Sequence, residues 1–140
     1  MIKRKLERYV QILNNIDGDQ DKFVWIMDFG KNSMPMEKEH KVKSFEVPGC
    51  QSQTWLVPHF VDDKIYFSAD SAALISKGMV CIIADVYSVS SAQDIREFDQ
   101  KEFDKMSLST LLTPGRNNGV HSMLKKVKFY AKKEDNKVAV

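Results

Sequence analysis

The chain has 140 residues, of which 43% are hydrophobic and 29% charged, and its formal net charge at pH 7 is only +2. This composition is typical of one soluble globular domain and excludes a disordered or fibrous protein. So small a net charge does not indicate binding to nucleic acid. Lys3, Arg4 and Lys5 interrupt the first apolar stretch, and the longest apolar run is too short to cross a bilayer. We therefore expect a cytoplasmic protein without membrane contact, whose two cysteines stay reduced.

The first third of the chain is predicted to be mostly helical. Apolar residues recur every three or four positions over residues 2–16, which predicts an amphipathic helix ending at the "DGD" of residues 17–19. A second helix is expected over about residues 20–29, with Gly30 placed to end it. Residues 31–49 are charged and contain two prolines, so we expect an ordered connection there.

The middle of the chain predicts a hairpin followed by a central helix. Residues 54–57 and 64–69 are rich in β-branched and aromatic residues and flank the polar pair Asp62-Asp63. Pro58 cannot donate a ladder hydrogen bond, so its strand is expected at an edge or with a bulge. Residues 71–88 are apolar on most sides and predict a core helix, with Asp70 or Ser71 as its cap.

The last third predicts short helices and then a long one. Ser91 and Asp94 suggest a capping box, and a helical turn is expected at residues 103–106. The last helix is expected over about residues 118–132, and a frayed tail from about residue 134. There is no internal repeat, so residues 1–140 are interpreted as a single domain.

The two cysteines lie in contrasting stretches. Cys81 lies within "MVCIIA", where a cysteine is expected to be a buried, inert hydrophobic residue. Cys50 lies in "VPGCQSQTW", next to glycine and polar residues that favour a loop tip. A thiol that reacts must be reachable and must ionise. Cys50 is therefore the candidate nucleophile.

Three kinds of function remain open from these residues. A cysteine hydrolase requires a base, for which His40, His59 and His121 are available. A docking module in which the cysteine is incidental is the second, and sulfur exchange at an accessible thiol is the third. No metal is expected, because the two cysteines and three histidines show no spacing of a metal site.

The stretch "TPGRNNG" is the second unusual one. Thr113 and Pro114 suggest the start of a helix, where the helix dipole disfavours a cation such as Arg116. Arg116 is expected to reach solvent or a carboxylate, to contact an acidic group of a partner, or to lower the pKa of a nearby thiol.

Taken together, these stretches resemble the SufE family of cysteine-desulfuration proteins. The family carries "GCQSQVW", then "ADSD" or "GDSD" leading into "A-I-KG", then aspartate with phenylalanine, then "LTPSRSNG". The corresponding stretches here are "GCQSQTW" at residues 49–55, "ADSAALISKG" at 69–78, "FD" at 98–99 and "LTPGRNNG" at 112–119. Two positions depart from the family pattern: Ala72 replaces an acidic residue and Gly115 replaces a serine.

The resemblance implies an α+β fold in which helices cover a small antiparallel sheet, similar to the U-type iron-sulfur scaffold. It also implies a sulfur carrier that stimulates a SufS-type cysteine desulfurase and passes sulfur to a downstream iron-sulfur scaffold. Such a carrier is an activator rather than a stand-alone enzyme, and it needs no cofactor because pyridoxal phosphate belongs to the desulfurase. Whether it is a monomer or a homodimer stays open.

The resemblance assigns roles to nine residues. Cys50 carries the persulfide, and Trp55 with the central helix is expected to line its resting shelter. The loop neighbours give reach and position, and the remaining residues support the site or bind the partner: Gly49, Gln51, Ser52 and Gln53 in the loop, and Asp70, Lys77 and Arg116 elsewhere.

Overall fold

The computed structural model describes residues 1–138, with side chains described through residue 133. Five α-helices, three 3-10 helices and two strands occur within this part of the chain. Their order is α1 (Ile2–Asn14), α2 (Asp19–Asn32), η1 (Lys38–His40), η2 (Lys43–Phe45), β1 (Thr54–Val61), β2 (Lys64–Ser71), α3 (Leu74–Tyr87), α4 (Ala92–Glu97), η3 (Gln100–Met106) and α5 (Pro114–Val138). The predicted α+β fold is confirmed. The predicted tail from about residue 134 falls partly on α5, and residues 139–140 lie outside the described residues.

The sheet is a single antiparallel hairpin of β1 and β2. Asp62 adopts a positive φ of 54° in its turn, a conformation that aspartate tolerates better than most residues. Pro58 pairs with Phe67 in an uninterrupted register, so it lies in an edge strand without a bulge. β2 continues two residues beyond its expected end and includes Asp70 and Ser71.

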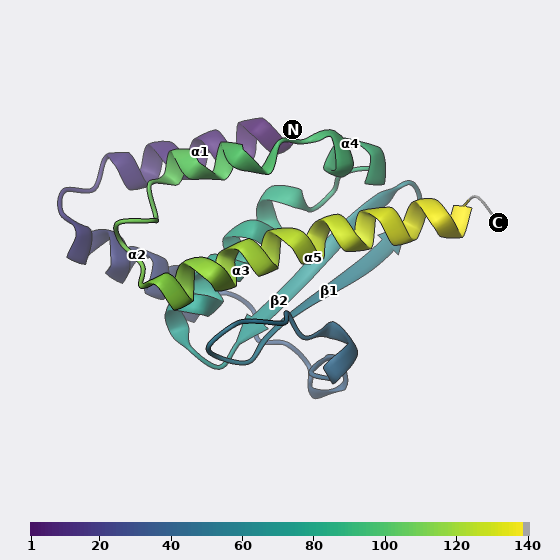
Figure 1. Cartoon of the computed structure of the whole chain (residues 1–140), viewed down its shortest axis with the longest axis horizontal. Helices are drawn as coiled ribbons and strands as arrows, with labels where there is room; N and C mark the ends of the chain where they lie inside the picture. The colour runs from purple at the N-terminus through teal and green to yellow at the C-terminus, as the bar shows by residue number, and fades with distance from the viewer. Residues whose placement is uncertain (139–140) are drawn as a thin grey trace.

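Helix α3 is the centre of the molecule. It packs against both strands and against α1, α2 and α5, and most of its side chains are buried. Figure 1 shows α5 crossing the hairpin, with α1 on the side of the molecule remote from the strands. Helix α3 begins at Leu74, with Ala73 as its N-cap. The prediction that Asp70 or Ser71 would be that cap was wrong, because both residues continue the ladder of β2.

A close crossing of α2 and α3 explains two glycines. Helix α2 continues to Asn32, so Gly30 does not end it as predicted. A Cβ on Gly30 would lie 2.6 Å from the backbone nitrogen of Gly78, and one on Gly78 would lie 2.1 Å from the carbonyl oxygen of Ile26. Both glycines are therefore needed for the two backbones to approach each other.

The C-terminal third has the predicted kinds of element with different bounds. The Ser91 hydroxyl accepts a hydrogen bond from the amide of Asp94 at 3.0 Å, as expected of an N-cap. Helix α5 starts at Pro114, four residues earlier than the expected Asn118. Arg116 consequently lies inside the helix, close to its start.

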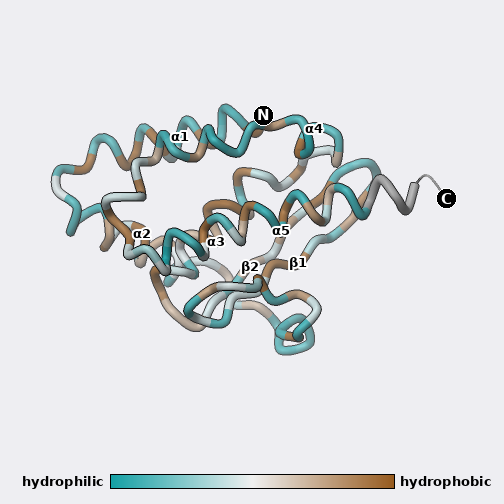
Figure 2. The backbone as a smooth tube through the Cα atoms, in the orientation of Figure 1, coloured by the Kyte–Doolittle hydropathy of each residue, from teal (hydrophilic) through white to brown (hydrophobic). Residues whose placement is uncertain are grey.

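The polarity of the helices follows from their positions. Figure 2 shows hydrophobic and hydrophilic residues alternating along α1 and α5, each of which buries one face. No helix in residues 1–138 combines the length and the apolar character needed to cross a membrane.

Candidate functional site

Cys50 lies in a short loop that a positive-φ glycine directs toward α5. Gly49 has φ 81°, which other residues rarely adopt, and a Cβ there would lie 3.1 Å from Oγ of Ser122. Cys50 lies in a loop as predicted and is half-buried. It lines a small cavity of about 10 Å³ together with residues of α3, α5 and the segment before α5: Ile75, Ser76, Met79, Leu112, Val120 and Met123.

Gly119 makes room for the thiol. A Cβ on this residue would lie 3.3 Å from Sγ of Cys50, and the thiol donates to the Gly119 carbonyl oxygen at 3.7 Å. Helix α5 therefore forms one wall of the resting place of the thiol.

Arg116 links the loop to the central helix. Its Nη1 donates to the hydroxyl of Ser52 in the loop at 3.3 Å and to that of Ser76 in α3 at 2.5 Å. Its own amide donates to Oγ1 of Thr113 at 3.3 Å, so Thr113 caps α5 as expected. The guanidinium of Arg116 therefore binds the hydroxyls of Ser52 and Ser76, whereas the sequence predicted solvent or a carboxylate as its partner.

Gly115 is explained by the loop residue Gln51. A Cβ at position 115 would lie 2.1 Å from Nε2 of Gln51, so a serine there would displace this side chain. The far end of the loop is fixed through Gln53, whose carbonyl oxygen accepts from the amide of Ala72 and from the hydroxyl of Ser71, both at 2.9 Å. The loop is thus held in place by Gln51 and Gln53, which follow the reactive residue.

The electrostatics of Cys50 oppose one another. Burial raises the pKa of the Cys50 thiol, while hydrogen bonding with Thr54 and the positive charge of Arg116 lower it. Burial is the largest of these effects, and the pKa of Cys50 lies above its ordinary value. Arg116 acts in the expected direction on the thiol without reversing the effect of burial. In this resting position the thiol is mostly protonated at neutral pH.

Trp55 does not line the shelter of Cys50, contrary to prediction. It pairs with Asp70 across the hairpin, and Nζ of Lys41 lies 5.3 Å from the centre of its ring. Successive strand residues point to opposite faces, and Thr54 rather than Trp55 faces the thiol. The expected contribution of the central helix does occur, through Ser76 and its neighbours Ile75 and Met79.

Asp70 is the centre of a buried charge cluster. Its carboxylate lies 3.3 Å from Nζ of Lys41 and 3.5 Å from Nζ of Lys77, and it accepts hydrogen bonds from the amides of Ser71 and Met36. Burial by itself raises the pKa of Asp70, but these amides and the two lysines outweigh it, and the pKa lies below its usual range. Asp70 and Lys77 thus hold the connection before η1 against β2 and α3, and neither lines the Cys50 cavity.

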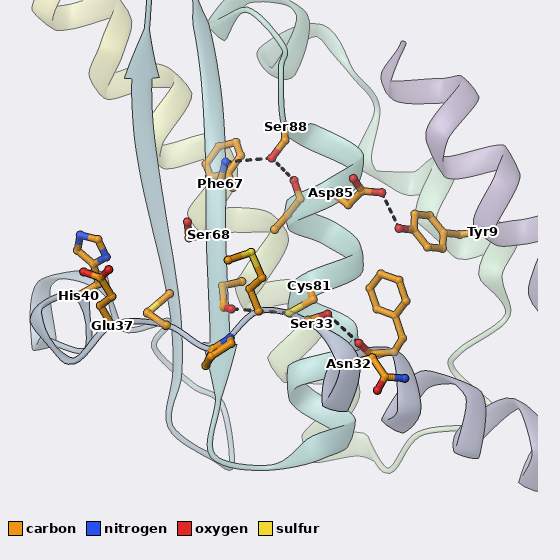
Figure 3. Close-up of a pocket in the computed structure, with 16 residues that line it drawn as sticks. Tyr9, Asn32, Ser33, Glu37, His40, Phe67, Ser68, Cys81, Asp85 and Ser88 are labelled. Carbon is orange, nitrogen blue, oxygen red and sulfur yellow. Dashed lines mark hydrogen bonds between the residues drawn. The ribbon is translucent and has the colours of Figure 1, made fainter.

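Cys81 lines the larger of the two thiol cavities, which has a volume of about 740 Å³. Figure 3 shows this cavity between β2, α3 and the end of α2, with the hydroxyl of Tyr9 bonded to Asp85 at one end. Cys81 is half-buried rather than enclosed as expected, and its thiol donates to the Ala69 carbonyl oxygen at 3.7 Å. Burial raises the pKa of this thiol, with a smaller upward effect of Asp70.

No histidine lines the Cys50 cavity. His59 shares a hydrogen bond of 2.9 Å with the hydroxyl of Ser68. The ring of His40 lies edge-on to the ring of His59, with the ring centres 5.6 Å apart. His121 lies on α5 at the cavity formed with Phe103 and Leu108. Among the described residues, no three His, Cys, Asp or Glu side chains are placed to hold a metal ion.

Known proteins resemble this chain in sequence or in fold. A family model described as "SufE: Fe-S metabolism associated domain" matches residues 7–131. The chain belongs to the SufE family. It is 30% identical over 126 residues to the "Cysteine desulfuration protein SufE" of Wigglesworthia glossinidia brevipalpis, which covers 89% of this chain and 88% of that protein. It is 34% identical over 122 residues to an uncharacterized SufE-like protein of Rhizobium etli, over 84% of this chain and 82% of that one.

The fold of this SufE-family chain also has a solved counterpart. A solution structure of a hypothetical protein from Thermus thermophilus superposes with a TM-score of 0.74, over 92% of this chain and 94% of that one. The two sequences are 14% identical, so this likeness concerns the fold alone.

One residue of the Cys50 site was not indicated by the sequence, and a second was indicated only as a glycine that leaves the backbone open to close contact. Ser76 accepts from Arg116, and Gly119, which ends the quoted "LTPGRNNG" stretch, accepts from the thiol. Ser76 carried no signal, because a serine in an apolar helix is ordinary until its partner is known.

Proposed function

We propose that this chain accepts sulfur from a cysteine desulfurase on Cys50, stimulates that desulfurase, and passes the sulfur on for iron-sulfur cluster assembly. The observation that carries the proposal is the position of Cys50, on a glycine-led loop against the glycine-lined start of α5. The family description and the name of the Wigglesworthia relative support the same chemistry.

The transfer step is a thiol exchange. The Cys50 thiolate attacks the outer sulfur of a persulfide on the desulfurase, a new S–S bond forms at Cys50, and the desulfurase cysteine leaves as a thiolate. Electrons balance without an external oxidant, because the transferred sulfur keeps its oxidation state. Pyridoxal phosphate serves the desulfurase, and this chain needs no cofactor of its own for the step.

The resting cavity suits protection rather than attack. Burial keeps the thiol protonated, and a cavity of about 10 Å³ holds no more than about one water-sized probe. A sulfur added to Cys50 would fill this space, with the apolar side chains of Ile75, Met79 and Met123 around it. Exchange with a partner requires Cys50 to leave the cavity.

Leaving the cavity is inexpensive. Around Cys50 the loop is held by the Arg116 bond to Ser52, by the weak thiol bond to Gly119 and by the packing of Gln51 against Gly115. The bonds to the carbonyl oxygens of Ser52 and Gln53 lie on the far side of Cys50 and can persist when the thiol moves out. A neutral hydrogen bond contributes about 1 kcal/mol and one from a charged group such as Arg116 about 2 kcal/mol, so a partner that replaces these contacts opens the loop at small cost. Ionisation of the extended thiol then follows, because the desolvation that raised its pKa is gone.

A hydrolase is disfavoured by the same geometry. The polar groups near Cys50 are the side chains of Gln51, Thr54, Ser76 and Arg116 and the Gly119 carbonyl, and none of them is a base of the strength that nucleophilic catalysis requires. A reducing compartment such as the cytoplasm suits the proposal, since both cysteines are free.

The test is to mix the chain with the cysteine desulfurase of its host and with cysteine, and to locate added sulfur by intact mass and non-reducing peptide mapping. We expect one or more sulfur atoms on Cys50 and none on Cys81. Absence of sulfur on Cys50, while the desulfurase itself turns over, would overturn the proposal.

A further inference from the structure

A basic groove begins at the Cys50 loop and follows α5. Pro48 and Gly49 form one wall, and the rest is lined by residues of α5: Ser122, Lys125, Lys126, Lys128, Phe129 and Lys132. Its volume is about 620 Å³. The backbone that carries the reactive thiol is thus also a wall of this groove.

The stripe that α5 presents here has helical spacing and one sign of charge. Ser122, Lys125, Phe129 and Lys132 are separated by three, four and three positions, which places them on one face of a helix. Residues 114–133 contain no Asp or Glu, and the first acidic residues of α5, Glu134 and Asp135, come after Lys132 at the far end of the stripe from the Cys50 loop.

The lysines of the groove have two different tasks. Lys126 donates to the carbonyl oxygen of Ser44 at 3.3 Å, and Lys128 donates to carbonyl oxygens at the end of α4. The ammonium groups of these two lysines are therefore already bonded to backbone oxygens of this chain. Lys125 and Lys132 are exposed and make no ion pair with a described acidic side chain, so their charges face whatever enters the groove.

Phe129 is the apolar element of the groove. It is 53% exposed although it lies between lysines, with Nζ of Lys126 5.5 Å from its ring centre. Aromatic side chains surrounded by more polar residues are common among the residues that dominate binding at protein interfaces. A segment that fits this groove carries carboxylates and at least one apolar side chain.

We infer that this groove, defined by Pro48, Gly49, Ser122, Lys125, Phe129 and Lys132, docks an acidic segment of the cysteine desulfurase beside the Cys50 loop. The inference rests on the proposed function. Charge complementarity and continuity with the loop select this occupant, because the desulfurase must approach Cys50 and the groove wall is the chain that holds it.

The test variant reverses the two exposed charges, Lys125→Glu with Lys132→Glu. The control is Lys3→Glu with Arg4→Glu on α1, which changes the net charge equally at exposed positions that do not line the groove. Circular dichroism checks that both variants are folded. Sulfur transfer from the desulfurase to Cys50 is measured against the concentration of each variant, at low and at high ionic strength.

We expect the groove variant to raise the half-saturating concentration about tenfold at low salt, with the maximal rate unchanged. The increase should shrink at high salt, because exposed charges are screened. Phe129→Ala should raise the half-saturating concentration about fivefold at both salt concentrations, since its contribution is apolar. The control should match the unaltered chain.

Equal half-saturating concentrations in the groove variant and the control would overturn the inference and leave the proposed function intact. Direct binding of the desulfurase without cysteine is measured in parallel. Charge-dependent binding without sulfur on Cys50 would sink the proposed function alone. Loss of binding to vesicles of anionic phospholipid, with sulfur transfer unaltered, would assign the groove to a lipid surface and overturn the inference.

Discussion

Cys50 and Cys81 are both half-buried thiols whose pKa is raised by burial, but the backbone that carries each of them differs. Cys50 lies in a loop that follows a positive-φ glycine, whereas Cys81 lies in the middle of α3, which packs on both strands and on three other helices. Exposure and pKa alone do not separate the two thiols. What distinguishes them is how far each can move without disturbing the core.

The volumes of the two cavities do not identify the thiol that is proposed to react. The larger cavity contains Cys81, and the small one contains Cys50. A carrier that delivers sulfur to another protein needs a thiol that leaves its cavity, so the volume around the resting thiol is a poor guide to its function. Local opening of a loop costs far less than displacement of a central helix.

The largest expected effect separates the two thiols completely. Cys50→Ser should abolish sulfur transfer from the desulfurase, because a serine hydroxyl cannot hold a persulfide. Cys81→Ser should retain transfer within about twofold. The Cys81 thiol donates to the Ala69 carbonyl oxygen within the fold, and a serine hydroxyl of similar size can take its place. The measurement is the rate of sulfur release from cysteine together with peptide mapping of each variant.

Retention of full transfer by Cys50→Ser would show that the cysteine is incidental and that the chain is a docking module. Loss of transfer in Cys81→Ser, with the circular dichroism spectrum unchanged, would contradict the assignment of a purely structural role to Cys81.

The pH dependence of alkylation is expected to have the same sign for both thiols. Rates with iodoacetamide should rise about tenfold per pH unit below each thiol pKa, because the thiolate is the nucleophile. Burial raises both pKa values, so each midpoint should lie above the ordinary value of about 8.5. Neutral thiols thus stabilise the fold below that pH, and this stabilisation is lost as pH rises through the folded-state pKa.

Each profile is measured in a variant that keeps one thiol, Cys81→Ala for Cys50 and Cys50→Ala for Cys81. In guanidinium chloride both midpoints should return to the ordinary value. A native midpoint of Cys50 below about 8.5 would mean that Arg116 and Thr54 outweigh burial.

A smaller effect should come from Gly119→Ala. Its Cβ would lie 3.3 Å from Sγ of Cys50, and the thiol can yield by moving outward with its loop. We expect alkylation of Cys50 to accelerate about threefold through more frequent local opening, with Cys81 unchanged. Asn118→Ala, an exposed neighbour in the same helix, is the matched control. Unchanged Cys50 alkylation in Gly119→Ala would mean that α5 does not restrain the thiol.

The order of helices and hairpin follows from periodicity, and the sequence predicted it because each long element repeats its pattern several times. Gly30 was misassigned because its reason is Gly78, which lies in another helix and is invisible to local patterns. Trp55 was placed at the shelter because the motif does not say which face of the strand meets the loop, and the side chain of its neighbour Thr54 faces the thiol instead.

At the site, the motifs led to Cys50, Gly49 and Arg116, whereas the contacts of Arg116 were not predictable. Its partners are two serine hydroxyls, one in the loop and one in α3, 64 and 40 residues away in sequence. Local chemistry predicted only that a cation at a helix start needs a partner, and tertiary packing decided which one.

Asp70→Asn should alter the reactivity of Cys81 and leave that of Cys50 unchanged, and its effect on alkylation should be the smallest of these. Asp70 raises the pKa of Cys81 and holds Lys77, whose charge lowers it. Removing the carboxylate removes this upward effect, so it should lower the pKa of Cys81 and speed its alkylation at pH 8. Cys50 should not respond, because Asp70 does not contribute to its pKa.

Asp85→Asn is the matched control, since Asp85 lines the same cavity but engages the hydroxyl of Tyr9 and does not contribute to the pKa of Cys81. Asp70→Asn should also lower the free energy of unfolding at neutral pH by about 2 kcal/mol. Because the folded-state pKa of Asp70 is depressed, its stabilisation is present above the unfolded value of about 3.9 and is lost as pH falls through the lower folded value. An equal response of Cys50 and Cys81 to Asp70→Asn would mean that the charge cluster couples to both thiols, and the two regions would then not be independent.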